Sequence, residues 1–361
     1  ENNLQTKIKN ILGSVDFDKQ ESLVKVSKLI RKYIIEGEMS ENLIKNIFKF
    51  YKTLGGVFKD ALVAVRSSAT AEDLPTASFA GQQETYLNVR GEANLIRKIK
   101  MAWASLFNAR AIYYRHEQHF DHFKVGIAIP VQKMVESEKS GIMFTLDPIT
   151  NDKTKIVIEA IYGLGELIVQ GAITPDHYEI SKKDLTITDK AIKIQDRLLK
   201  KSGTADKEVK IPVNIGKKQK LSDKEILQLA EIGKKIEKHY YFPQDIEWAI
   251  EKNKIYIVQT RPITTINQKS KIENQKSEDS LKLILSGDPA SPGIASGPCR
   301  VIKSAKEIGK VIAGEILVAP QTNPDFVPAM KKAKAIITDS GGRTSHAAIV
   351  SRELGIPAVV G

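Results

Sequence analysis

The chain has 361 residues, of which 42% are hydrophobic and 27% are charged, and its formal net charge is +12. This length is more than one ordinary core needs, so we expect two or three domains with the composition of a soluble globular protein. The lack of an apolar run of about 18 residues excludes a membrane span, and the N-terminal stretch has no signal-peptide core. A single cysteine excludes an internal disulfide, so we expect a cytoplasmic protein. The basic residues are mostly lysines spread along the chain, which predicts no specific nucleic-acid partner.

The first 60 residues are predicted to be helical, and a β-rich region follows them. Apolar residues recur at helical spacing from Leu23 to Ile34 and from Leu43 to Tyr51, and Gly55-Gly56 should end the second helix. A single long helix is expected from about Glu92 to Gln118. Short apolar runs predict strands at residues 62–65, 126–132, 141–145, 155–158 and 255–258.

A loop rich in small and hydroxyl residues follows the first predicted strand. It runs from Arg66 to Asp73 and continues from Ser78 to Thr85. The backbone N–H groups of such a loop can bind phosphates, and Arg66 is a natural cation for a polyphosphate. On the residues alone, a turn-rich loop with one surface arginine remains an equal alternative.

Two strands near residue 250 are predicted to pair as a hairpin. Glu247 and Gln259 lie on either side of a turn near Asn253, so pairing would place their side chains on one face. Arg261 follows Gln259 by two residues and shares that face. A carboxylate oxygen and an amide oxygen are hard ligands that suit Mg²⁺. The alternative is an ordinary surface hairpin with a salt bridge.

Residues 266–282 are almost wholly polar, which is the composition of a flexible linker. The segment after it, residues 283–361, is rich in glycine and alanine and is predicted to form a second compact domain. No internal repeat is visible in the chain.

The strongest local pattern lies between Ser340 and Val350. An apolar strand at Ala335–Thr338 precedes it, and the glycine pair Gly341-Gly342 allows the backbone to turn. A helix should follow, with Thr344 or Ser345 as its N-cap.

His346 would then lie in the first turn of this helix. Free N–H groups and the positive end of the helix dipole hold a phosphate there, and the same field lowers the pKa of an imidazole. Arg343 could bind phosphoryl oxygens. We therefore take Arg343, Thr344 and His346 as candidate catalytic residues; helix capping without chemistry is the alternative.

Residues 341–361 (GGRTSHAAIVSRELGIPAVVG) closely resemble the swivelling phosphohistidine domain of the PEP-utilizing enzymes. This family includes phosphoenolpyruvate synthase, pyruvate phosphate dikinase, rifampicin phosphotransferase and Enzyme I of the sugar phosphotransferase system. Its motif histidine accepts a phosphoryl group, which implies that role for His346. Residues 290–298 (ASPGIASGP) resemble the segment that opens the same domain.

The two upstream clusters, in residues 63–85 and 245–262, resemble the ATP-grasp-type nucleotide domain of these enzymes, which implies ATP and Mg²⁺ as cofactors. Residues 159–178 match as well, without definite roles. The resemblance implies phosphate contacts for Arg66, Gly81 and Thr85, a place near the adenine for Gln132, and metal and phosphate contacts for Glu247, Gln259 and Arg261. Of these, Glu247 and Gln259 would be the metal ligands.

The expected fold is therefore a multidomain mixture of α/β and α+β. An ATP-grasp-like domain at residues 1–265 would precede the linker at 266–282 and a swivelling phosphohistidine β/α domain at 283–361. The family's glycine-rich stretch with an ATP-contacting lysine and its pyruvate-binding barrel have no counterpart in these residues. We therefore expect a fragment that is incomplete at both ends, from a longer protein that could be an oligomer.

The resemblance implies a dikinase reaction. The β-phosphoryl group of Mg-ATP would pass to His346 and then to pyruvate, giving phosphoenolpyruvate, AMP and phosphate. Phosphoenolpyruvate synthase is favoured because the nucleotide domain runs directly into the histidine domain, and pyruvate phosphate dikinase is a close variant. A rifampicin phosphotransferase-like kinase, which has a large intervening domain, and a non-catalytic phosphohistidine carrier remain alternatives.

Overall fold

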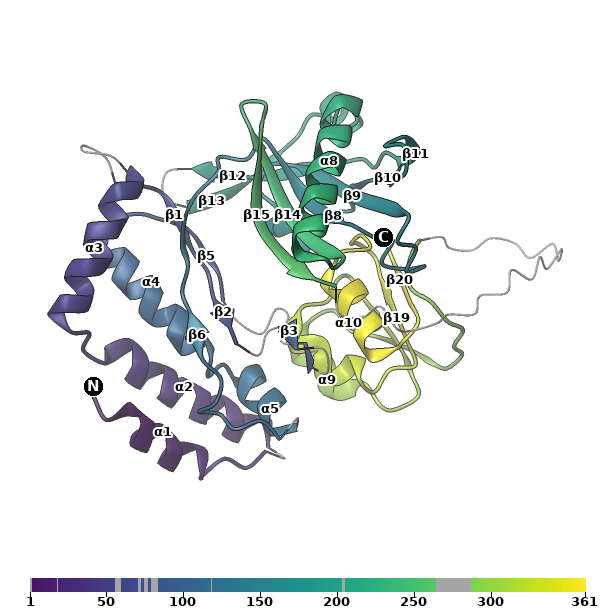
Figure 1. The fold of residues 1–361 in the computed structure, drawn as a ribbon. Coiled ribbons are helices and arrows are strands. Elements are labelled where there is room, and N and C mark those ends of the chain that lie inside the picture. The colour runs from purple at the N-terminus through teal and green to yellow at the C-terminus, as the bar shows by residue number, and fades with distance from the viewer. Residues whose placement is uncertain are drawn as a thin grey trace. The chain divides into compact units, whose positions relative to one another are not determined.

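The computed structural model describes residues 2–17, 19–55, 60–70, 73–74, 77–78, 84–117, 119–202, 205–263 and 287–361. Gly81 and the predicted linker at 266–282 lie outside the described residues. The chain divides into two compact units, the first made of Glu1–Met134 with Lys201–Asp206, and the second of Val135–Lys200 with Lys207–Gly361. The predicted mixed α and β class is confirmed (Figure 1). None of the described helices combines the length and apolar character needed to cross a bilayer.

Amphipathic helices make up much of the first unit. They are α1 (Leu4–Leu12), α2 (Gln20–Glu36), α3 (Glu41–Gly55), α4 (Glu92–Ser105) and α5 (Ala109–Glu117). The two helices predicted from apolar spacing are confirmed as α2 and α3. Apolar residues such as Leu23, Val26 and Ile30 of α2 are buried because they recur on one side of the helix.

The single long helix expected between Glu92 and Gln118 is wrong, because the chain turns between α4 and α5. Leu106 and Phe107 leave the helical path and are buried in the core that α2 also lines. The buried guanidinium of Arg115 donates to the carbonyl of Leu106 at 2.6 Å and so satisfies a group freed at the helix end.

Short strands complete the first unit. They are β1 (Val63–Val65), β2 (Ser68–Ala69), β3 (Asp73–Leu74), β4 (Ala77–Ser78), β5 (Tyr86–Val89), β6 (Ile127–Ala128) and β7 (Val131–Lys133). The predicted strand at 62–65 is confirmed as β1, the centre of an antiparallel sheet in the order β5-β1-β7. The strand expected at 126–132 is divided into β6 and β7, which pair with β2 and β1. Pro130 lies at the division and lacks the N–H that a continuous ladder requires.

A six-stranded antiparallel sheet forms the larger part of the second unit, in the order β11-β10-β9-β8-β14-β15 (Figure 1). Its strands are β8 (Lys139–Phe144), β9 (Lys155–Tyr162), β10 (Asp176–Ser181), β11 (Ile187–Ala191), β14 (Gln244–Glu251) and β15 (Lys254–Pro262). The strands predicted at 141–145, 155–158 and 255–258 are confirmed as parts of β8, β9 and β15. The same unit contains α6 (Glu166–Val169), α7 (Val213–Gly216) and the paired strands β12 (Arg197–Ser202) and β13 (Ala205–Lys210), of which Lys201–Asp206 belongs to the first unit.

Helix α8 (Asp223–Tyr240) packs on one face of the six-stranded sheet. The helix starts at a capping box in which Ser222 and Glu225 satisfy each other's backbone N–H groups. Ile158, Ile246 and Trp248 point towards α8 in a shared apolar core. Because side chains alternate along a strand, Glu159 and Glu247 lie on the opposite face.

The last part of the second unit is a five-stranded sheet in the order β16-β20-β19-β18-β17. Its strands are β16 (Asp288–Ser291), β17 (Cys299–Val301), β18 (Ile316–Ala319), β19 (Ala335–Thr338) and β20 (Ala358–Val360). All neighbours are parallel except the edge strand β16. The helices are α9 (Val327–Met330), α10 (His346–Leu354) and the 3₁₀ turns η1 (Ala305–Lys310) and η2 (Pro324–Phe326). The strand and the helix predicted around the glycine pair are confirmed as β19 and α10.

Candidate active site

His346 is the first residue of α10 and is half-buried. Of the two candidate N-caps, the structure selects Ser345, whose Oγ accepts the Ala348 N–H at 3.4 Å. The free N–H groups and the positive dipole end of α10 therefore lie beside the imidazole, as the sequence predicts.

Thr322 fixes the imidazole from the other side. Its Oγ1 lies 2.8 Å from His346 Nδ1, and the residue is only 2% exposed. Thr322 follows β18 and the His346 loop follows β19, and these strands are parallel neighbours. Side chains at adjacent carboxyl ends of parallel strands converge at one edge. Sequence analysis missed Thr322, which only the strand order identifies.

The turn before α10 contacts the six-stranded sheet of the same unit through Glu159 on β9. Glu159 Oε1 accepts the Arg343 backbone N–H at 2.9 Å, and Oε2 accepts the Thr344 hydroxyl. Ser340 Oγ donates to the carbonyl of Gly171 at 2.8 Å. Thus the predicted catalytic segment makes three hydrogen bonds, two to β9 of the sheet and one to the loop between α6 and β10.

Charge and close packing accompany these hydrogen bonds. Burial raises the pKa of Glu159, while its hydrogen bonds and the nearby charges of His177 and Arg343 act in the opposite direction. The Arg343 guanidinium also lies 3.7 Å from Glu179 Oε1. Gly342 approaches so closely that a Cβ there would lie 2.7 Å from Pro175 and 2.9 Å from Glu159 Oε2.

The predicted hairpin is confirmed as β14–β15, with its turn at Lys252 and Asn253, both of which have positive φ. Glu247 and Gln259 are direct cross-strand neighbours, so their oxygen donors share one face as predicted. A carboxylate oxygen and an amide oxygen in this arrangement fit the few protein ligands that Mg²⁺ uses alongside phosphate oxygens and water. The metal role of this pair stays a prediction.

Arg261 is held by a partner that the sequence did not single out. Its Nε donates to Asp245 Oδ2 at 3.1 Å across the same strand pair. Burial raises the pKa of Asp245, the charge of Arg261 lowers it, and the charge of Glu247 raises it. Asp245 therefore positions Arg261 beside the predicted metal ligand.

One transverse row of the six-stranded sheet connects the hairpin to the catalytic turn. The registers place Gln259, Glu247, Ile142, Glu159 and His177 opposite one another on β15, β14, β8, β9 and β10. Glu247 and Glu159 are two strands apart, which corresponds to roughly 10 Å between their backbones. The turn before His346 is thus bound on the same face as the predicted metal ligands.

The remaining predicted residues belong to the first unit. Arg66 directly follows β1 and its N–H donates to Pro130 O at 3.0 Å. Gln132 lies on β7 and is the register partner of Ala64 on β1. Thr85 directly precedes β5. Arg66, Thr85 and Gln132 are therefore carried by one small sheet, while their contacts with a nucleotide stay a prediction.

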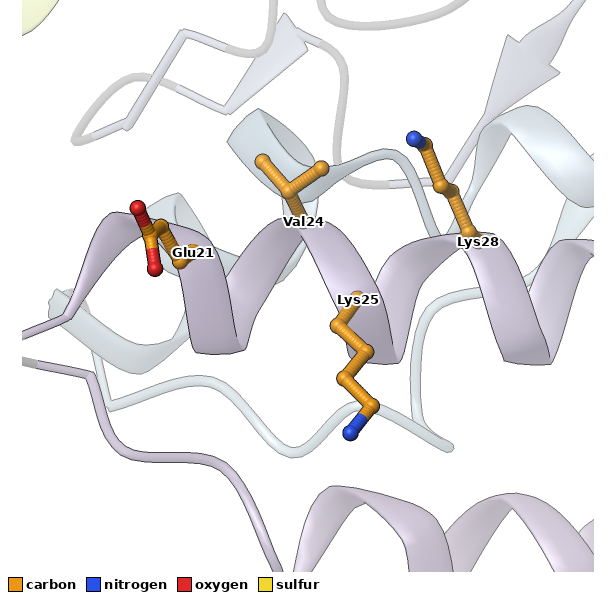
Figure 2. A pocket seen from close by; sticks show the side chains of 4 residues that line it. All are labelled: Glu21, Val24, Lys25 and Lys28. Atoms are coloured by element: carbon orange, nitrogen blue, oxygen red, sulfur yellow. The ribbon is translucent and has the colours of Figure 1, made fainter.

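A pocket of about 410 Å³ lies on α2. Figure 2 shows Glu21, Val24, Lys25 and Lys28 around it, all from that single helix. None of the predicted site residues that the structure describes lines this pocket, so it carries no functional assignment.

Comparison with known proteins matches both parts of the chain. The pyruvate phosphate dikinase AMP/ATP-binding domain matches residues 1–281, and the mobile domain of PEP-utilising enzymes matches residues 311–361. Phosphoenolpyruvate synthase from Pyrococcus furiosus is 50% identical over 369 residues, which cover 99% of this chain and 45% of that protein. Phosphoenolpyruvate synthase from Aquifex aeolicus is 48% identical over 386 residues, which cover 100% of this chain and 45% of that protein.

A relative of lower identity is matched over a similar share of both chains. Phosphoenolpyruvate synthase from Aeropyrum pernix is 42% identical over 393 residues, which cover 98% of this chain and 48% of that protein. The chain thus spans about half the length of the curated relatives that it matches. Identity at this level over nearly the whole chain places it, with its AMP/ATP-binding and mobile domains, in the phosphoenolpyruvate synthase family of PEP-utilising enzymes.

Proposed function

We propose that this chain is the ATP-using and phosphohistidine-carrying part of a phosphoenolpyruvate synthase. In this proposal the β-phosphoryl group of Mg-ATP passes to His346 with release of AMP, water takes up the γ-phosphoryl group to give free phosphate, and the β-phosphoryl group then passes to pyruvate. The observation that carries the proposal is the turn before His346 bound to Glu159, in the same sheet row as Glu247 and Gln259.

The proposed nucleotide contacts are those that the resemblance implies. Arg66, Gly81 and Thr85 would contact the phosphates, and Gln132 would lie near the adenine. Glu247 and Gln259 would hold Mg²⁺, which neutralises charge on the phosphoryl oxygens when bound. Arg261, oriented by Asp245, would add a second cation for the same oxygens.

Thr322 is proposed to set the tautomer of the nucleophile. If Nδ1–H donates to Thr322 Oγ1, the lone pair of the imidazole is on Nε2, which becomes the attacking atom. The positive end of α10 favours the neutral ring that this attack requires. Thr344 and Arg343 would bind the phosphoryl oxygens once the group is transferred.

The test uses ATP labelled separately at the β and γ positions, with Mg²⁺ and the 361-residue chain. A chimera carrying flanking segments from the Pyrococcus furiosus relative would be run in parallel. We expect acid-labile label from β-labelled ATP alone, and none in the His346→Ala variant. Label from neither position in both proteins would overturn the proposal and favour a phosphohistidine carrier that is loaded by another protein.

Replacing Thr322 with valine should lower the rate of His346 phosphorylation by about 10- to 100-fold, the effect seen when the group that orients a metal-bound histidine is removed. Valine keeps the shape of threonine but cannot accept a hydrogen bond from Nδ1–H. ¹⁵N NMR of the imidazole should show a shift in tautomer at the same time. The Thr322→Ser variant retains a hydroxyl and should recover most of the rate; equal rates in all three proteins would contradict the assignment.

A further inference from the structure

We propose that Arg31 is a positioning residue for the nucleotide phosphates, and that it acts through Glu84 on the neighbouring Thr85. The inference rests on the proposed function in taking Arg66 and Thr85 as phosphate contacts. It adds a side chain from α2, a helix that no sequence motif connects with them. All four residues belong to the first unit.

Arg31 holds the carboxylate of Glu84 by both oxygens. Its Nη2 lies 3.0 Å from Glu84 Oε1 and 3.3 Å from Oε2, and the two side chains are only 30% and 27% exposed. The hydroxyl of Tyr86 donates to Oε2 of the same carboxylate. Burial and this hydrogen bond raise the pKa of Tyr86, so the phenol stays protonated and keeps donating. Glu84 is thus held from two sides.

These contacts start from helices that are fixed in the core. Arg31 follows Ile30, which is fully buried, and Ser27 Oγ one turn earlier donates to the carbonyl of Phe107 at 2.7 Å. On the other side, Lys98 Nζ of α4 lies 4.5 Å from the centre of the Tyr86 ring. Helices α2 and α4 also pack on each other. Residues 84–86 are therefore tied to a rigid helical layer.

The position of Glu84 determines where Thr85 points. Tyr86 is the register partner of Val65 in the antiparallel pair β5–β1. One further step of this register places Thr85 opposite Arg66. Because side chains alternate along an extended chain, Glu84 points to the helices while Thr85 points to the opposite face. Holding Glu84 therefore keeps Thr85 on the face that it shares with Arg66.

Arg31 also balances a charge that would oppose a nucleotide. Without its partner, the carboxylate of Glu84 would be a free negative charge one residue from a proposed phosphate contact, and like charges repel at such a distance. Loss of Arg31 should therefore weaken ATP binding in two ways. Thr85 would be less well oriented, and the charge of Glu84 would be uncompensated.

Arg31→Met removes the guanidinium and keeps an apolar stem. The KM for Mg-ATP in His346 phosphorylation should rise about tenfold, the size expected when a hydrogen bond to a charged group is lost. The rate at saturating ATP should change by less than about threefold, because a contact that binds substrate and transition state alike affects KM alone. Arg31→Lys keeps the charge and should recover part of the affinity. A wild-type KM in Arg31→Met would overturn the proposal.

Lys32→Met is the matched control on the same helix. Lys32 is the next residue of α2, and it pairs with Glu36 at 3.9 Å where both side chains are largely exposed. Its loss should leave the KM for Mg-ATP unchanged, because it does not reach residues 84–86. A tenfold rise in this control as well would assign the effect to the general charge of α2 and overturn the specific role of Arg31.

A double-mutant cycle tests the action through Glu84. Glu84→Gln removes the charge that Arg31 neutralises, so adding Arg31→Met to it should raise the KM little further. Rises that multiply in the double variant would show that the two residues act independently, and would overturn the action through Glu84.

Hydrogen exchange without nucleotide separates this inference from the proposed function. The backbone amides of β5 should exchange about tenfold faster in Arg31→Met and in Glu84→Gln, but not in Lys32→Met. Exchange that accelerates equally over α2, α4 and β5 would show a loss of stability of the whole unit and overturn a local holding role. If neither the chain nor the chimera is phosphorylated from ATP, the proposed function fails. Faster exchange in β5 alone would then still support the holding of residues 84–86, and unchanged exchange would overturn it.

Discussion

Replacing Lys220 with methionine is expected to lower the free energy of unfolding of the second unit by about 3–5 kcal/mol, because it leaves a buried carboxylate without its counter-ion. Lys220 Nζ lies 2.8 Å from Asp176 Oδ1, and both side chains are fully buried. The ammonium also donates to the carbonyls of Gly216 and Lys193, and Tyr178 donates to Asp176 at 2.8 Å. The pair thus connects β10 to two chain segments outside the sheet.

Unfolding of this unit can be followed by the fluorescence of Trp248, which lies in the same apolar core as Tyr178 and Leu221. The other tryptophan, Trp103, belongs to the first unit and would be replaced by phenylalanine in every sample. Lys190→Met is the matched control, since Lys190 pairs with Asp223 where both side chains are exposed to solvent. Exposed pairs contribute at most about 1 kcal/mol. Equal urea midpoints for the two variants would show that the buried pair contributes no more to the free energy of unfolding than the exposed pair does.

Replacing Glu247 with alanine is expected to lower phosphorylation of His346 by more than about 100-fold, because removal of groups that merely orient a metal ligand already costs about 10- to 100-fold. Glu247 supplies the carboxylate of the predicted metal pair, and Gln259 alone would leave Mg²⁺ with a single neutral protein ligand. The apparent Mg²⁺ requirement should rise in parallel. The measurement is incorporation of label from β-labelled ATP across a Mg²⁺ titration.

Glu251→Ala is the control, because it removes the same kind of side chain from the last residue of the same strand. Its carboxylate accepts the Glu136 N–H, away from the predicted ligands. A Glu247→Ala variant with wild-type incorporation at every Mg²⁺ concentration would remove Glu247 from the metal site.

Elements with regular burial were predictable from the sequence. Apolar residues at helical spacing identified α2 and α3, and short apolar runs identified β8, β9 and β19, because each of these elements is buried against an apolar core. The break between α4 and α5 was not predictable, since it depends on Arg115 reaching the carbonyl of Leu106. Such a contact leaves no periodic trace in the sequence.

The same distinction applies to the candidate site. His346 at a helix start and the pairing of Glu247 with Gln259 follow from short-range patterns, which the structure reproduces. Thr322 and Glu159 contact the catalytic segment from 24 and about 185 positions away. Neither has a local motif, so each becomes visible only when the strands are ordered into sheets.

The edge strand β16 has a mechanical consequence for the five-stranded sheet. β16 is antiparallel to β20, and Asp288 at the start of β16 pairs with Val360 at the end of β20. β16 and β20 are the first and last strands of this sheet in chain order, and the start of β16 therefore lies beside the end of β20 at one corner of the sheet. The turn before α10 lies at this same corner, where a Cβ on Gly361 would be 3.0 Å from the Gly341 carbonyl oxygen, so any displacement of the corner would be passed directly to the segment that carries His346.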